Sequence, residues 1–115
     1  QGVVSVGFTP KAVWLVSANA VASTVVQAIA RHSFGIGDFN LNQFAHWYGD
    51  ADNVATSVTS SSYSRSKIVR MMTEGGGSPT LVAEAALASM DYDGFTLNWS
   101  TVDATAREVL YFAIG

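Results

Sequence analysis

The stretch from Asp91 to Gly115, DYDGFTLNWSTVDATAREVLYFAIG, decides the fold of this chain. Its first half, Gly94–Trp99, alternates apolar and polar residues one by one. This period of two predicts a β-strand with one buried side and one side facing water. Asp91–Gly94 ends in Asp-Gly, a strong signal for a tight hairpin turn. The alternating residues of the strand are Phe95, Thr96, Leu97, Asn98 and Trp99.

The second half of the stretch predicts another strand, Glu108–Ile114, after a turn-rich connector at Ser100–Arg107. This second run is apolar at almost every position. We therefore expect both of its faces to be covered, with the strand central in a sheet, buried, or packed against a neighbouring molecule.

The rest of the chain predicts further short strands separated by turns. Lys11–Ala18 (KAVWLVSA) is apolar enough to be buried on both faces. Thr24–Phe34 and Thr80–Met90 tolerate a helix by propensity, but their neighbouring turn signals favour strands. Thr56–Ser66 is rich in serine and fits either a flexible loop or a wet edge strand. The remaining strand candidates are Gly2–Val6, Asn42–Tyr48 and Lys67–Thr73, and the turns are Gly49–Asn53 and Glu74–Pro79.

About eight short strands with turns between them predict an all-β fold, an antiparallel β-sandwich of jelly-roll-like type. The 115 residues suit one domain, residues 1–115, and we find no internal repeat or linker. The chain begins at Gln1 rather than Met, as expected for a processed product or a piece of a longer protein.

Charged residues are scarce, at 13% of the chain, against about 25% in ordinary soluble domains. Hydrophobic residues make up 49%. Two interpretations of this scarcity of charge stay open. In the first, much of the surface is in contact with other protein molecules; in the second, the chain is a small neutral β-protein coated with Ser and Thr.

The composition also indicates several absences. The net charge is -3 and the six basic residues are scattered, so no nucleic-acid partner is predicted. No run of about 18 apolar residues exists, so no membrane-spanning segment is predicted. The chain has no cysteine, which excludes disulfides and thiolate chemistry.

No motif indicates a cofactor, a metal or an enzyme active site. His32 and His46 have no spacing that brings them together with a carboxylate. A calcium loop starting at Asp91 fails, because its twelfth position is Val102 rather than Glu. The aspartates of the turns are explained by bonds to nearby backbone amides. We therefore expect a protein that is not an enzyme.

The aromatic residues offer one candidate ligand site. Trp14 and Trp99 lie in the most apolar strands, which favours the core. The Trp47-Tyr48 pair lies at a strand end beside His46 and Asp50, where aromatic rings could stack on sugars. A carbohydrate-binding module that recognises host surface glycans is therefore the alternative function.

Two stretches of the chain resemble a group of small β-rich proteins encoded by tailed bacteriophages and prophages. One is Val6–Val13 (VGFTPKAV) and the other combines Asp93–Trp99 with Asp103–Val109. Asp52–Thr56 is also similar to that group. The resemblance implies a structural component of the virion, such as a capsid decoration, a head fibre or a tail-associated domain, and it implies no catalytic residues.

The resemblance and the low charge together predict a virion protein that acts by protein–protein packing. We expect a homo-oligomer, for example a trimer, that packs against other capsid or tail proteins. The residues expected to form its assembly strand lie near the C-terminus: Val109, Tyr111, Phe112 and Ile114.

Overall fold

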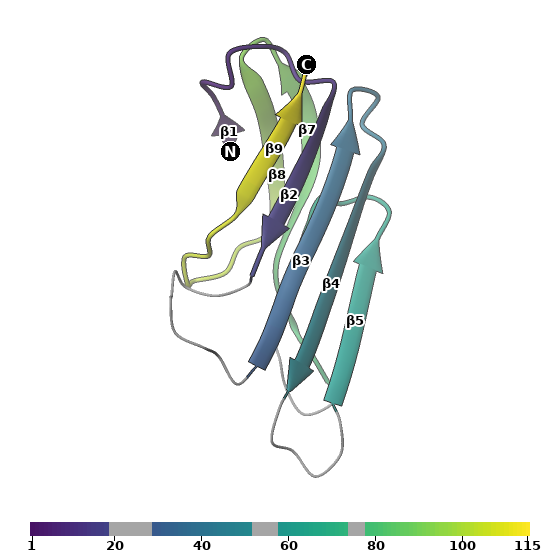
Figure 1. The fold of residues 1–115 in the computed structure, drawn as a ribbon. Coiled ribbons are helices and arrows are strands. Elements are labelled where there is room, and N and C mark those ends of the chain that lie inside the picture. Colours follow the sequence, from purple (N-terminus) through teal and green to yellow (C-terminus); the bar gives the residue numbers. More distant parts are fainter. Residues whose placement is uncertain (19–28, 52–57, 74–77) are drawn as a thin grey trace.

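The computed structural model describes residues 1–18, 29–51, 58–73 and 78–115. The described residues form nine strands and no helix, and the strands make two antiparallel sheets that face each other (Figure 1). The four-stranded sheet contains, in spatial order, β1 (Gly2–Val3), β8 (Gly94–Thr101), β7 (Leu81–Asp91) and β6 (Val69–Met72). The five-stranded sheet contains β5 (Val58–Ser64), β4 (Gln43–Ala51), β3 (Ile29–Asp38), β2 (Ala12–Ser17) and β9 (Leu110–Ile114).

The all-β prediction is thus confirmed, and the arrangement is sandwich-like. Most spatial neighbours are also consecutive in the sequence, so each sheet is a meander to which one terminal strand is added. The jelly-roll-like connectivity is not confirmed, because that fold is built from two Greek keys.

The core lies between the inner faces of the two sheets. The largest fully buried side chains include Trp47 and Phe95, one from each sheet. The buried hydrophobic residues are Val13, Leu15, Ala45, Trp47, Ile68, Val69, Met71, Ala83, Ala85, Leu87, Phe95 and Leu97.

The hairpin formed by β7 and β8 follows the sequence prediction. Asp91 pairs with Gly94, which leaves a two-residue turn. Phe95 and Leu97 are buried while Asn98 is exposed, as the period of two requires. Thr80–Met90 becomes strand β7 rather than a helix, because its alternate small residues pack into the core and tertiary contacts override helix propensity.

The chain itself does not cover Glu108–Ile114 on both faces, so a central position in the sheet is wrong, while covering by a neighbouring molecule stays a prediction. Strand β9 is an edge strand that pairs only with β2 among the described strands. Its outward side chains are exposed: 66% for Leu110, 61% for Phe112 and 41% for Ile114. The apolar sequence of β9 therefore gives it an inner face in the sandwich and an outer face that no described part of the chain covers.

Two other features differ from the predictions. Strand β2 is buried on one face only, since Val16 on the other face is 47% exposed. Gly49–Ala51 continues strand β4 instead of beginning a turn. Thr56–Ser66 contains the edge strand β5, which is one of the two alternatives that its sequence allows.

The first strand is shorter than predicted. It ends at Val3, and the positive φ angles of Ser5 (67°) and Gly7 (87°) turn the chain away from the sheet. Residues 19–28, 52–57 and 74–77 lie outside the described residues. They include the stretch Asp52–Thr56 and parts of the predicted segments Thr24–Phe34, Gly49–Asn53, Thr56–Ser66 and Glu74–Pro79.

The two sheets are in close contact where Gly35 of β3 meets the backbone of Ile68, the residue before β6. A methyl group on Gly35 would overlap the carbonyl oxygen of Ile68. A methyl group on Gly37 would come within 2.7 Å of the side chain of Leu87. Gly35 lets the backbone of β3 lie directly against the backbone of Ile68, and Gly37 leaves room for the side chain of Leu87.

We predict that Gly35→Ala lowers the free energy of unfolding by about 3 kcal/mol, since the clash is with backbone and overpacking cannot be relieved by a rotamer change. Urea unfolding followed by circular dichroism measures this. Gly2→Ala is the control, because its added methyl group would have only a 4.0 Å contact. Equal stabilities of the two variants would contradict the close approach of the sheets.

Candidate functional site

The outward face of the five-stranded sheet is an apolar surface that crosses several strands. In an antiparallel sheet, residues directly opposite each other point to the same side. Register therefore gathers these residues on one face, which we call the apolar face: Trp14, Val16, Phe34, Ile36, Phe44, Tyr48, Leu110, Phe112 and Ile114.

Two rows of the apolar face run across the sheet. One row joins Leu110, Val16 and Phe34, which are opposite one another on β9, β2 and β3. The next row joins Phe112, Trp14, Ile36 and Phe44 in the same way, on β9, β2, β3 and β4.

Aromatic rings on this side of the sheet contact each other in pairs. The ring centroids of Trp14 and Phe112 are 5.7 Å apart, so β9 is tied to β2 by side chains as well as by backbone bonds. His32 stacks on Tyr48 at 5.1 Å. Such pairs add about 0.5–1.5 kcal/mol beyond the area they bury.

The outward side of an antiparallel sheet normally carries polar residues. Here Val16 is 47% exposed and Phe34 is 39% exposed, next to the more exposed Leu110 and Phe112. This contiguous exposed apolar surface makes the apolar face the candidate functional site.

The fold does not bring the predicted ligand residues together on one exposed face. These residues are His46, Trp47, Tyr48 and Asp50. Trp47 is only 1% exposed and belongs to the core, so its ring is closed to a ligand. Its Nε1 atom has no hydrogen-bond partner among the described residues. His46 and Tyr48 point to the opposite side of β4, and Asp50 accepts a hydrogen bond from Thr59 Oγ1 at 3.2 Å. The alternation of β4 separates Trp47 from its neighbours, because successive side chains point to opposite faces.

The predicted assembly strand divides between two faces. Phe112 and Ile114 belong to the apolar face. Val109 and Tyr111 instead lie on the inner side, where Tyr111 meets the ring of Phe95 edge to face at 5.5 Å.

Several residues of the apolar face were not predicted from the sequence. Trp14 was assigned to the core, yet it lies half-buried on the outward side. Val16, Phe34, Phe44 and Leu110 were not singled out. The signal for Trp14 and Val16 was the apolar run Lys11–Ala18, which has too few polar residues for a strand with a wet face.

The aspartates of the turns have structural roles. Hydrogen bonds from the Asn42 side chain and from backbone amides lower the pKa of Asp38. Hydrogen bonds from Thr96 and then Ser89 lower the pKa of Asp91. Within the described ranges, no three His, Asp or Glu residues group together as a metal site requires.

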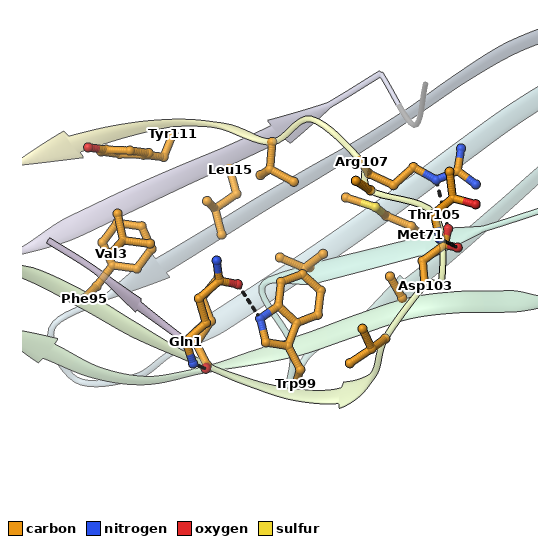
Figure 2. Close-up of a pocket in the computed structure, with 16 residues that line it drawn as sticks. Gln1, Val3, Leu15, Met71, Phe95, Trp99, Asp103, Thr105, Arg107 and Tyr111 are labelled. Atoms are coloured by element: carbon orange, nitrogen blue, oxygen red, sulfur yellow. Dashed lines mark hydrogen bonds and ion pairs between the residues drawn. The ribbon is translucent and has the colours of Figure 1, made fainter. Parts of the chain in front are cut away.

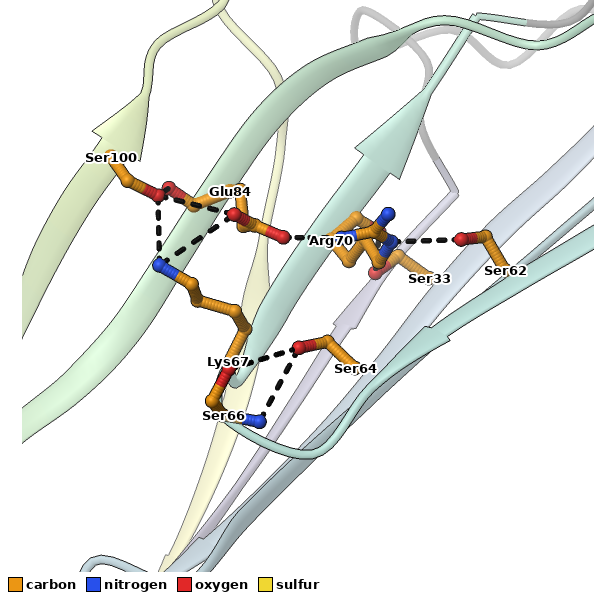
Figure 3. Close-up of polar contacts among 8 residues, drawn as sticks. All are labelled: Ser33, Ser62, Ser64, Ser66, Lys67, Arg70, Glu84 and Ser100. Atoms are coloured by element: carbon orange, nitrogen blue, oxygen red, sulfur yellow. Dashed lines mark hydrogen bonds and ion pairs between the residues drawn. The ribbon is translucent and has the colours of Figure 1, made fainter.

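The only basic residues that lie close together in the sequence are partly engaged by a carboxylate (Figure 3). Glu84 of β7 forms ion pairs with Arg70 Nη1 and, at 3.6 Å, with Lys67 Nζ. Arg70 Nε also donates to Ser62 Oγ of β5 at 2.8 Å, and Lys67 Nζ donates to Ser100 Oγ at 3.0 Å. The cluster therefore links the two sheets along the edge formed by β5 and β6.

Comparison of the chain with protein-family models, with curated proteins and with solved structures found no match in any of the three. Among the described residues, no helix has the length and apolar character needed to span a membrane.

We predict that Glu84→Gln lowers the free energy of unfolding by about 1–3 kcal/mol, because two half-buried cations lose their counter-charge. The loss should shrink as salt is added, since salt screens the repulsion between Lys67 and Arg70. Denaturant unfolding at low and high salt measures both effects. Glu108→Gln, at an exposed position, is the control. A loss for Glu84→Gln that equals the control would contradict a stabilising cluster.

Proposed function

We propose that this chain is a non-enzymatic structural domain of a viral particle, which acts by packing against copies of itself and against other virion proteins. The apolar face is the observation that supports protein–protein packing. This face ends at β9, an apolar edge strand that has no neighbour on its outer side among the described strands. The assignment to a virion rests on the resemblance of Val6–Val13, and of Asp93–Trp99 with Asp103–Val109, to phage structural proteins.

A second copy of the chain fits the open edge of β9. An edge strand presents unpaired backbone N–H and C=O groups, and soluble proteins usually protect such edges with charges or proline. The segment Val109–Gly115 contains neither. Two copies of β9 can therefore pair antiparallel about a two-fold axis with no like-charge contact, and this would join two apolar faces into one continuous surface.

The other edge of the same sheet shows a contrasting chemistry. Strand β5 is VTSSSYS, in which Ser and Thr fill most positions. Hydroxyl-bearing side chains remain favourably hydrated when exposed, so this edge gains little from association. The difference between the two edges supports assembly through β9 rather than at both ends of the sheet.

The two stretches that carry the resemblance contact each other in the fold. The Asp93 carboxylate accepts hydrogen bonds from the backbone N–H groups of Ser5 (3.1 Å) and Gly7 (2.6 Å). Thr9 Oγ1 donates to the Tyr92 carbonyl at 3.1 Å. These contacts fasten the N-terminal turn to the β7–β8 hairpin, which supports a structural role for both stretches and fits a protein without a catalytic site.

Glycan recognition remains the second candidate. The burial of Trp47 removes the residue on which that hypothesis chiefly depended. It is favoured by the stacked pair of His32 and Tyr48 and by the 65% exposure of Tyr63, since these rings lie on the apolar face or beside it. A glycan array with Tyr48→Ala as the comparison separates this candidate from protein packing.

We predict that Phe112→Asp shifts the chain from oligomer to monomer at micromolar concentration. Burying a Phe side chain contributes about 1.5–3 kcal/mol, so its loss should raise the dissociation constant at least about tenfold. The introduced charge would add a desolvation cost at the interface. Sedimentation velocity over a range of protein concentrations measures the change.

Tyr92→Asp is the matched control for this experiment. Tyr92 is 90% exposed and lies in the β7–β8 turn rather than on the apolar face, so its replacement should leave the oligomer intact. A parent chain that stays monomeric at high micromolar concentration would contradict the self-assembly part of the proposal.

A further inference from the structure

The sandwich is open on one side. The sheets are close where Gly35 meets Ile68, but they separate between β8 and β9, where a cavity of about 410 Å³ lies between them (Figure 2). Protein interiors have few voids larger than a water molecule, so this space is far larger than a packing defect. Its volume lies within the range of about 300–1,000 Å³ that is typical of small-molecule pockets.

The floor and walls of this cavity are apolar. Strands of both sheets supply its deeply buried residues, each at most 5% exposed: Leu15, Val69, Met71, Ala83, Phe95 and Leu97. Water that enters would find few hydrogen-bond partners on this floor, and such a cavity holds water poorly. The chemistry of the floor favours an apolar occupant.

Polar groups gather at the rim. Gln1 and Thr105 line the cavity and are exposed, which places them at its mouth. Gln1 Oε1 accepts a hydrogen bond from Trp99 Nε1 at 2.9 Å and holds the indole ring along the wall (Figure 2).

An ion pair lies at the rim of the cavity. Arg107 Nε donates to Asp103 Oδ2 at 2.8 Å, and both side chains are largely shielded from solvent. The backbone N–H of Thr105 also donates to Asp103 Oδ1, at 2.8 Å. The Asp103–Arg107 pair therefore brings no net charge to the mouth, and beside it the N-terminal ammonium of Gln1 donates to the Leu97 carbonyl oxygen at 2.7 Å.

We propose that this cavity binds one uncharged small molecule with an apolar body and a polar end, such as a long-chain alcohol or an uncharged aromatic amine. The apolar body would lie against the floor and the polar end would meet the amide and hydroxyl groups of the mouth. A quaternary ammonium head is disfavoured, because the Asp103 carboxylate is already paired with Arg107 and the N-terminal ammonium of Gln1 adds positive charge nearby. This site is separate from the apolar face, since Tyr111 and Phe112 point to opposite sides of β9.

The test uses N-phenyl-1-naphthylamine, an uncharged dye whose fluorescence rises in apolar sites. The parent protein should bind one dye per chain, and 1-dodecanol should displace it. Dodecyltrimethylammonium should displace it at least tenfold less well. Equal displacement by the alcohol and the ammonium compound would overturn the proposed ligand class, and no saturable binding would overturn the site.

Variants locate the dye. Ala83→Leu fills the cavity from β7, and Leu15→Phe fills it from β2, so a folding failure in one leaves the other informative. Each should reduce dye affinity at least tenfold while the protein still unfolds cooperatively. Two control variants, Ala86→Leu and Phe112→Asp, should bind the dye like the parent. Ala86 follows Ala85 on β7, so its side chain points to the face opposite the cavity. Normal binding by both filled variants, or loss of binding in Phe112→Asp, would overturn the assignment to this cavity.

Discussion

The contact between Gly35 and the backbone of Ile68 is the constraint on which the rest of the structure depends. It fixes the distance between the sheets along one side, because no side chain separates the two backbones. The ion pairs of Glu84 close the same side between β5, β6 and β7. The sandwich is consequently narrow at this edge and open at the other, where β8 and β9 enclose the cavity.

The five-stranded sheet is apolar on both of its faces, and this explains the composition of the chain. Its inner face buries Val13 and Leu15 in the core, while its outer face carries Trp14 and Phe34. A sheet built in this way needs few charged residues, which agrees with the charged fraction of 13%. The scarcity of charged residues is most evident on one surface, the apolar face, which the proposed pairing of β9 would join to the apolar face of a second copy.

The sequence predicted the strands whose pattern is local. The alternation of Phe95, Thr96 and Leu97 predicts strand β8, and the Asp-Gly pair predicts the turn before it. Both patterns can be recognised without knowledge of distant contacts, and the β7–β8 hairpin follows from them. For β9 the sequence left a central and an interfacial position open, because an apolar run has the same pattern whether it is buried or lies at an open edge, and the structure places the strand at an edge. Trp14 and Trp47 were assigned to the wrong sides for a related reason. Which alternate residues face the core depends on pairing with strands far away in the sequence.

Hydrogen–deuterium exchange of the backbone amides of β9, measured at several protein concentrations, tests the central claim of self-assembly through this edge most directly. If copies pair through β9, its amides should exchange more slowly as concentration rises, while those of β5, at the other edge of the same sheet, should stay unchanged. Exchange in β9 that is fast and independent of concentration would contradict the account.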